Sequence, residues 1–273
     1  MRQNLIWLLL LCAFVVYEIS YMMFYAYLDS KNLHEYENKP NHRIAICISG
    51  QVRDFEQTYP LLKKNMIDVL KPDIFCYMDG NESDETKDRF VSLYKPVRIV
   101  WCTKQFEHTM ITPNSDKMFY RIYKCNDLKK QYEQQRGNKY DAVMRLRPDM
   151  VFHYTFPYHI IETVVNTHNT VYIPQWYLFN IVNPAHALYD IMAIGDSTSM
   201  DVYSDTHNHL QEHSKHECTA PEFILKQYMD NTRVDVRYFI YDHMIKKTIL
   251  QKIKFPYEKI IKNKYYLCVS VFS

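Results

Sequence analysis

The sequence predicts an α/β fold with a mostly parallel central sheet between layers of helices, preceded by an N-terminal transmembrane helix. Short apolar runs of strand length alternate with segments whose apolar residues recur at helical spacing. The first run, 43–49, is rich in isoleucine and stops at Gly50, as is typical of a strand buried on both faces. This alternation predicts a three-layer domain in which helices connect parallel strands.

The expected elements follow one another in a regular order as far as residue 150. The first strand leads into a helix at 55–70, and a long helix at 118–135 ends before Gly137 and leads into a strand that begins at Tyr140. The other expected elements are strands at 73–78, 97–102, 170–173, 191–194 and 234–240, and helices at 198–209 and 221–229. The segment 246–273 is expected to add a peripheral helix or strand pair.

Composition excludes several classes of protein. Hydrophobic residues make up 47% of the chain and aromatic residues 15%, which indicates a globular protein. The net charge of +2 gives no bulk attraction for nucleic acid, so we expect no nucleic-acid partner. With only four glycines and neither a G-x-G-x-x-G nor a P-loop pattern, the chain lacks the glycine-rich loops of those phosphate-binding folds.

The N-terminal stretch 5–28 is apolar apart chiefly from Glu18 and Ser20, and it is long enough to cross a bilayer core of about 30 Å. A cleaved signal peptide is the alternative, but no convincing cleavage site follows. We therefore expect a transmembrane signal anchor at 1–28, a polar stem at 29–42 and one domain at 43–273. The short head before a long domain favours a single-pass type II protein with a lumenal C-terminal domain.

Two further features bear on a lumenal location. Asn81, Glu82 and Ser83 form an N-glycosylation sequon in a polar loop, which fits a lumenal domain. None of the seven cysteines forms a C-x-x-C pair. Several lie in strand-like runs, where a free buried thiol is the favoured reading and a disulfide the alternative.

Charged residues gather at the expected carboxyl ends of two strands. The loop after the first strand contains Gly50, Gln51 and Arg53, and the strand that begins at Tyr140 carries Arg145, Arg147 and Asp149 around Pro148. Alternation along a strand would project these last three charges from one face. In open α/β sheets ligands bind beyond the carboxyl ends of the strands. If the two strands are neighbours, the arginines converge on a diphosphate while Asp149 binds a metal ion or a ribose hydroxyl.

Four motifs together resemble those of glycosyltransferase-like proteins with a GT-A core, which occur in large DNA viruses and some bacteria and algae. They are the segments ICISGQVR at 46–53, YDAVMRLRPD at 140–149, IGDSTSMD at 194–201 and PEFIL at 221–225. The resemblance spans about residues 43–240, and R-x-R-P-D is its most specific part. It implies a nucleotide-sugar donor and a glycan, protein or lipid acceptor.

The resemblance also implies roles for individual residues. In GT-A enzymes an Asp-x-Asp motif binds the donor through a divalent cation, Mn²⁺ or Mg²⁺, and Arg147 to Asp149 occupy that place. Because arginine replaces the first aspartate, direct neutralisation of phosphate by Arg147 is the alternative. Asp196 and Glu222 become the catalytic candidates, against the plainer readings of a helix cap and a stabilising first-turn acid.

These observations predict a glycosyltransferase. A catalytically inactive carbohydrate-binding or scaffold protein on a degenerate transferase fold is the alternative, because the Asp-x-Asp motif is incomplete. A phosphate-ester hydrolase would need a second carboxylate or histidine cluster at the same strand ends, and none is evident.

Overall fold

The computed structural model describes residues 2–37, 39–104, 113–174, 187–210, 220–239 and 243–245. The expected C-terminal elements at 246–273 lie outside these ranges.

A seven-stranded sheet forms the centre of the domain, with strand order β3-β2-β1-β4-β7-β6-β8. Only β7 runs antiparallel to its neighbours, and the other paired strands are parallel. The strands are β1 (Ile44–Gly50), β2 (Asp73–Asp79), β3 (Arg98–Cys102), β4 (Ala142–Leu146), β6 (Thr170–Pro174), β7 (Ala193–Gly195) and β8 (Asp235–Phe239). A second, two-stranded sheet pairs β5 (Met150–Phe152) with β9 (His243–Ile245). The predicted mostly parallel sheet is therefore confirmed.

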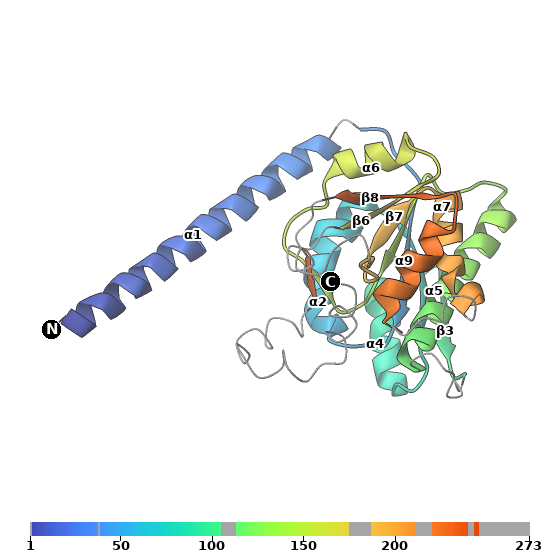
Figure 1. The fold of residues 1–273 in the computed structure, drawn as a ribbon, viewed down its shortest axis with the longest axis horizontal. Coiled ribbons are helices and arrows are strands. Elements are labelled where there is room, and N and C mark those ends of the chain that lie inside the picture. Colours follow the sequence, from blue (N-terminus) through green and yellow to red (C-terminus); the bar gives the residue numbers. More distant parts are fainter. Residues whose placement is uncertain are drawn as a thin grey trace.

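Helices lie on both sides of this sheet (Figure 1). One side of the sheet carries α2 (Phe55–Leu62), the π-helical turn η1 (Lys63–Ile67), α3 (Asp68–Leu70) and α4 (Asp84–Tyr94). The other side carries α5 (Pro113–Arg136), α7 (Ser197–Ser204), the 3-10 turn η3 (Asp205–His209) and α9 (Pro221–Asp230). The helix α6 (Tyr158–Val165) packs against β4 and β7. Aromatic rings pack within and between the layers: Phe55 of α2 lies 5.4 Å from Phe90 of α4 between ring centroids, and Phe75 of β2 lies 5.6 Å from Tyr132 of α5. The strands β1, β2 and β4 are buried along most of their length, as the isoleucine-rich pattern of the first run predicts, whereas the edge strands β3 and β8 are more exposed.

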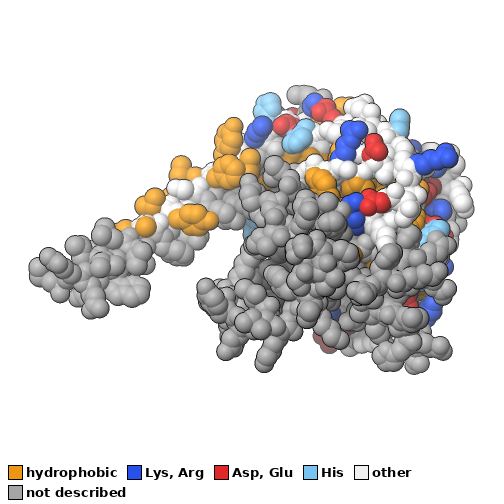
Figure 2. All heavy atoms as spheres, viewed as in Figure 1, with side chains coloured by type: hydrophobic (Ala, Val, Ile, Leu, Met, Phe, Trp, Pro, Cys, Tyr) orange, Lys and Arg blue, Asp and Glu red, His pale blue; other side chains and the backbone are white. Residues whose placement is uncertain are grey.

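The helix α1 (Arg2–Tyr36) projects from the domain and contains the stretch expected to be a membrane anchor (Figure 1). Within the ranges described above, no helix is both long and apolar enough to cross a membrane. Large apolar side chains of α1, among them Val16, Met22 and Met23, are nevertheless exposed, and Figure 2 shows them along the projecting helix.

The segment expected to be a polar stem is instead helical up to Tyr36, and its polar side chains dock on the domain. Asp29 accepts hydrogen bonds from the Thr155 amide at 2.6 Å and the Thr155 hydroxyl at 2.7 Å. Asn32 donates to the Thr155 carbonyl at 2.7 Å, and Tyr36 donates to the Phe156 carbonyl at 2.8 Å. The polar residues of this segment thus form hydrogen bonds to the domain.

Candidate active site

The strand order places a topological switch point between β1 and β4. From β1 the chain passes outward to β2 and then β3, whereas β4 pairs with the other side of β1. Loops that leave two such strands in opposite directions open a crevice at their carboxyl ends, which is where open α/β sheets bind ligands. The loops that begin at Gly50 and Arg147 leave the sheet at this point.

The two loops contact each other. Gly50 has a φ of +137°, and a Cβ added there would lie 3.8 Å from Cδ of Pro148. Thr58, on α2, donates a hydrogen bond to the Pro148 carbonyl at 2.8 Å and so ties the second loop to the first helix. Gln51 and Arg53 follow Gly50 and are exposed at the same edge, where their side chains can reach a ligand.

Arg147 and Asp149 form a bidentate ion pair across the proline. Nε and Nη2 of Arg147 donate to the two carboxylate oxygens of Asp149 at 2.9 and 2.7 Å. Burial by itself would lower the pKa of Arg147, but the hydrogen bonds and charge of Asp149 raise it above its usual value. The side chain of Arg147 is 27% exposed, whereas that of Asp149 is 3% exposed. A ligand anion at this edge therefore meets Arg147 first.

Arg145 lies near Arg147 and Asp149 but is buried, whereas the expectation was that all three charges project from one face of a strand. β4 ends at Leu146, and the chain turns through Pro148 before Asp149. Arg145 is buried, and among the residues that the structure describes its Nε and Nη1 have no hydrogen-bond partner. Burial lowers its pKa, against the opposing influence of Tyr203 and Asp190. Its charge acts on neighbouring groups from inside the domain.

Asp190 and Glu222 complete an acidic group beside these arginines. Because β7 runs antiparallel to β4, the residues just before β7 lie at the carboxyl end of β4. The Leu188 amide donates to the Glu222 carbonyl at 2.9 Å, which joins this segment to the start of α9. Burial raises the pKa of Asp190, although Arg145 and Arg147 oppose the rise. Asp190 could not be singled out from the sequence, because its position depends on the antiparallel direction of β7.

Glu222 has the pKa of a candidate general base. Burial, followed by the nearby charge of Asp190, raises its pKa to about 7, with Arg147 acting in the opposite direction. A carboxyl group with a pKa near 7 exchanges protons readily at neutral pH, which is the property that general acid and base catalysis requires. Of the two predicted catalytic residues, Glu222 is the one that the fold brings to the arginines.

Asp196 lies at the opposite edge of the sheet, so the catalytic role expected for it is corrected. Gly195 pairs with Val143 near the amino end of β4. The Asp196 carboxylate caps α7: it accepts bonds from the amides of Thr198 at 2.9 Å and Ser199 at 3.1 Å. It also accepts from the Asn169 amide at 3.2 Å. These contacts are those of an N-cap, which was the plainer reading of the sequence.

The described residues do not form a metal site. Both oxygens of Asp149, the predicted metal ligand, accept hydrogen bonds from Arg147. Within the ranges that the structure covers, no group of three or more histidine, cysteine, aspartate or glutamate side chains is placed to hold a metal ion. The donor set therefore does not fit the divalent cation that the Asp-x-Asp comparison implied, and Arg147 supplies positive charge in that place.

A second buried ion pair marks the neighbouring part of the same edge. Asp79 ends β2, and its carboxylate accepts a hydrogen bond from Nη2 of Arg121 on α5 at 2.7 Å. Nε of Arg121 has no partner. Beside it, the ammonium of Lys104 lies 4.1 Å from the ring centroid of Tyr120.

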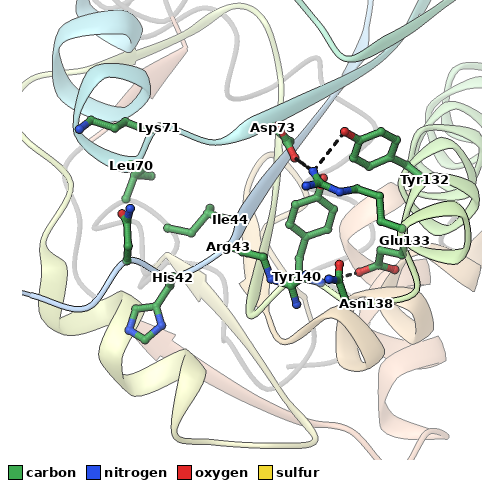
Figure 3. A pocket seen from close by; sticks show the side chains of 12 residues that line it. His42, Arg43, Ile44, Leu70, Lys71, Asp73, Tyr132, Glu133, Asn138 and Tyr140 are labelled. Carbon is green, nitrogen blue, oxygen red and sulfur yellow. Dashed lines mark hydrogen bonds and ion pairs between the residues drawn. The ribbon is translucent and has the colours of Figure 1, made fainter.

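A cavity of about 240 Å³ lies at the other, amino-terminal edge of the sheet (Figure 3). Its polar groups pair with one another: Tyr140 donates to Asp73 at 2.6 Å, and Arg136 lies 3.7 Å from the same carboxylate. Glu133 accepts from the Tyr140 amide at 2.8 Å. Because these contacts satisfy the charged groups, the cavity is better explained as part of the packing of α5 against the strand starts than as an active site.

Comparison with known proteins adds little to this geometry. No protein-family model matches the chain, and no curated protein matches it either. Among solved structures, the chain is similar to a candidate nucleotide-diphospho-sugar transferase from Desulfovibrio desulfuricans G20, with 12% sequence identity and a TM-score of 0.41. The similarity covers 71% of this chain and 79% of that one.

Proposed function

We propose that the domain is a glycosyltransferase that moves a sugar from a nucleotide-sugar donor to a hydroxyl group of a glycan, protein or lipid acceptor. The observation that carries the proposal is the proximity of Arg147 to Glu222, a carboxyl group with a pKa of about 7, at the switch point of the sheet. The four sequence motifs that resemble glycosyltransferase-like proteins supply the reaction class.

Each group at the edge has a role in the proposed reaction. Arg147, supported by the exposed Arg53, neutralises the diphosphate of the donor, because guanidinium groups match phosphate oxygens in geometry and charge. Asp149 fixes the orientation of Arg147 through its bidentate pair. Asp190 raises the pKa of Glu222, and Arg145 in turn opposes the rise in the pKa of Asp190.

The bond changes follow from these roles. The acceptor hydroxyl gives its proton to Glu222 as its oxygen forms a bond to the anomeric carbon of the sugar. The bond from that carbon to the diphosphate oxygen breaks, and the electron pair leaves with the nucleoside diphosphate. Arg147 stabilises the negative charge that develops on the departing oxygen.

Donor binding provides the first test. We expect at least one nucleotide sugar in a panel to raise the melting temperature of the full-length protein, with or without Mn²⁺, because Arg147 neutralises the phosphate. Arg147→Ala should abolish that shift, whereas Arg237→Ala, which removes an exposed arginine on β8, should leave it intact. A panel without any shift would favour the alternative of an inactive scaffold.

We also propose that α1 tethers the domain to a membrane with the C-terminal domain lumenal. The exposed apolar side chains of α1 and the apolar sequence 5–28 support this placement. Asn81 is exposed in the loop after β2, where a glycan can be attached. Expression in a glycosylating cell should give a protein that resists carbonate extraction and loses mass on deglycosylation, and Asn81→Gln should remove the mass difference.

A further inference from the structure

A second cavity lies on the helical layer, away from the strand ends that form the candidate active site. It has a volume of about 270 Å³ and is lined by residues of α5, α7, η3 and α9. This size is just below the range of about 300–1,000 Å³ that is usual for small-molecule sites, so a single ring is the natural occupant. We call it the outer-face cavity.

Its walls combine aromatic rings with hydrogen-bonding groups. Tyr123 and Tyr228 contribute rings, and the carboxylates come from Asp127, Asp201 and Asp205. Asn126, which also lines the cavity, is 4% exposed; its Nδ2 donates to Asp201 at 2.8 Å, but its Oδ1 has no partner. Asn126 thus holds Asp201 at the cavity wall, and the exposed Lys130 adds a donor group to the lining.

Two of the three carboxylates have a cationic partner, which weakens the attraction for a cationic ligand: Lys129 lies 2.8 Å from Asp201, and Lys124 lies 4.0 Å from Asp127. The ammonium of Lys129 and the amide of Asn126 both donate to Oδ1 of Asp201, each at 2.8 Å. Gln131 donates to Oδ2 of Asp127 at 3.2 Å, and Asn208 donates to Oδ1 of Asp205 at 2.6 Å. The remaining carboxylate oxygens can accept hydrogen bonds without presenting a strong unpaired charge.

We propose that the outer-face cavity binds a neutral sugar ring. Adjacent sugar hydroxyls donate to carboxylate oxygens and accept from amide groups, which are the groups that line this cavity. The apolar face of the ring packs on a tyrosine, whose apolar body and polar tip suit an amphipathic ligand. The site lies outside the proposed reaction centre, and its occupancy does not require sugar transfer.

Ligand-observed NMR titration of the full-length protein tests this inference. The probes are the methyl glycosides of glucose, galactose, mannose and N-acetylglucosamine, and the protein is kept in a detergent without a sugar headgroup. We expect at least one glycoside to bind with a dissociation constant on the order of 1 mM, as suits a small ligand held by a few hydrogen bonds. Tyr123→Ala and Asp127→Ala should each weaken that binding at least fivefold.

Two variants serve as controls. Asp235→Ala removes an exposed carboxylate on β8, outside the cavity, and should leave the affinity unchanged. Glu222→Gln should also bind normally, which separates failure of this inference from failure of the proposed reaction. The inference is overturned if no glycoside binds, or if tetramethylammonium binds in place of a glycoside. It is also overturned if the Tyr123→Ala and Asp127→Ala variants bind as the wild type does while their melting temperatures show that they are folded.

Discussion

At the scale of single residues, the proposed reaction depends on Glu222, whose raised pKa suits a general base. A general base typically contributes about 10²–10⁴-fold to a rate. Glu222→Gln should therefore lower kcat by about that factor while the affinity for the donor stays the same. In the wild type, kcat should rise as the pH passes through about 7, because only the deprotonated carboxylate accepts the proton. A pH profile of kcat checks this, and an equally active Gln variant would contradict it.

The same raised pKa has a consequence for stability. The folded protein favours the protonated form of Glu222. Stability is therefore lost progressively as the pH rises from the ordinary pKa of a glutamate to about 7, and above that pH the loss stays constant. Glu222→Gln should therefore melt at a higher temperature than the wild type at pH 8 and at nearly the same temperature at pH 5. An identical difference at both pH values would show that the carboxyl group is not buried as described.

Arg145, Arg147 and Asp149 show how far residue spacing could predict the site. Their alternation correctly drew attention to the end of β4, and Gly50 to the end of β1. It could not show that the strand ends at Leu146, after which Pro148 turns the chain and lets Asp149 pair with Arg147. A periodicity argument holds only while the strand continues.

At the scale of elements, the direction of β7 decides which acidic residues reach the site. Apolar length indicated a strand at this place, but a run of three to five apolar residues contains no information about its direction. Because β7 is antiparallel, Asp190 lies at the carboxyl end of β4 and Asp196 at its amino end. Only the pairing of β7 with β4 and β6 in the structure shows which of the two aspartates lies at the carboxyl end of β4.

Asp196 is therefore expected to affect stability alone. Asp196→Ala removes the cap of α7 and should lower the free energy of unfolding by about 0.5–2 kcal/mol. Asp196→Ser restores a capping oxygen and should recover most of this loss. Denaturant unfolding measures both, and kcat/KM for either variant should equal that of the wild type. A large fall in kcat/KM for the Ala variant that Ser does not restore would return Asp196 to the active site.

The loop after β1 depends on the backbone of Gly50. Its φ of +137° is a conformation that side chains rarely adopt, so Gly50→Ala should cost about 1–3 kcal/mol in stability and raise the KM for the donor. Gly137→Ala is the matched control, because its φ is +72° and an added Cβ meets nothing within 4 Å. It should lose stability without a change in KM. If both variants keep the wild-type KM, the β1 loop does not contact the donor.

At the scale of the whole molecule, α1 and the domain form one docked unit. The amphipathic and apolar patterns predicted a separate anchor, stem and domain, but hydrogen bonds from Asn32 and Tyr36 cannot be read from periodicity. Removal of residues 2–28 should therefore preserve the melting temperature of the domain, measured in detergent. Removal of residues 2–37 breaks the docking bonds, each worth about 1 kcal/mol, and should lower the melting temperature by several degrees. Equal melting temperatures would show that the docking contributes nothing.

The central claim is that Arg147 and Glu222 form the reaction centre of a nucleotide-sugar transferase. The release of nucleoside diphosphate from a panel of nucleotide sugars tests it most directly, with the wild type, Arg147→Ala and Glu222→Gln assayed side by side as full-length proteins. We predict release from at least one donor by the wild type, a raised KM for Arg147→Ala, and a rate at least about 100-fold lower for Glu222→Gln. Release by all three proteins at the same rate, or by none from any donor, would contradict the claim.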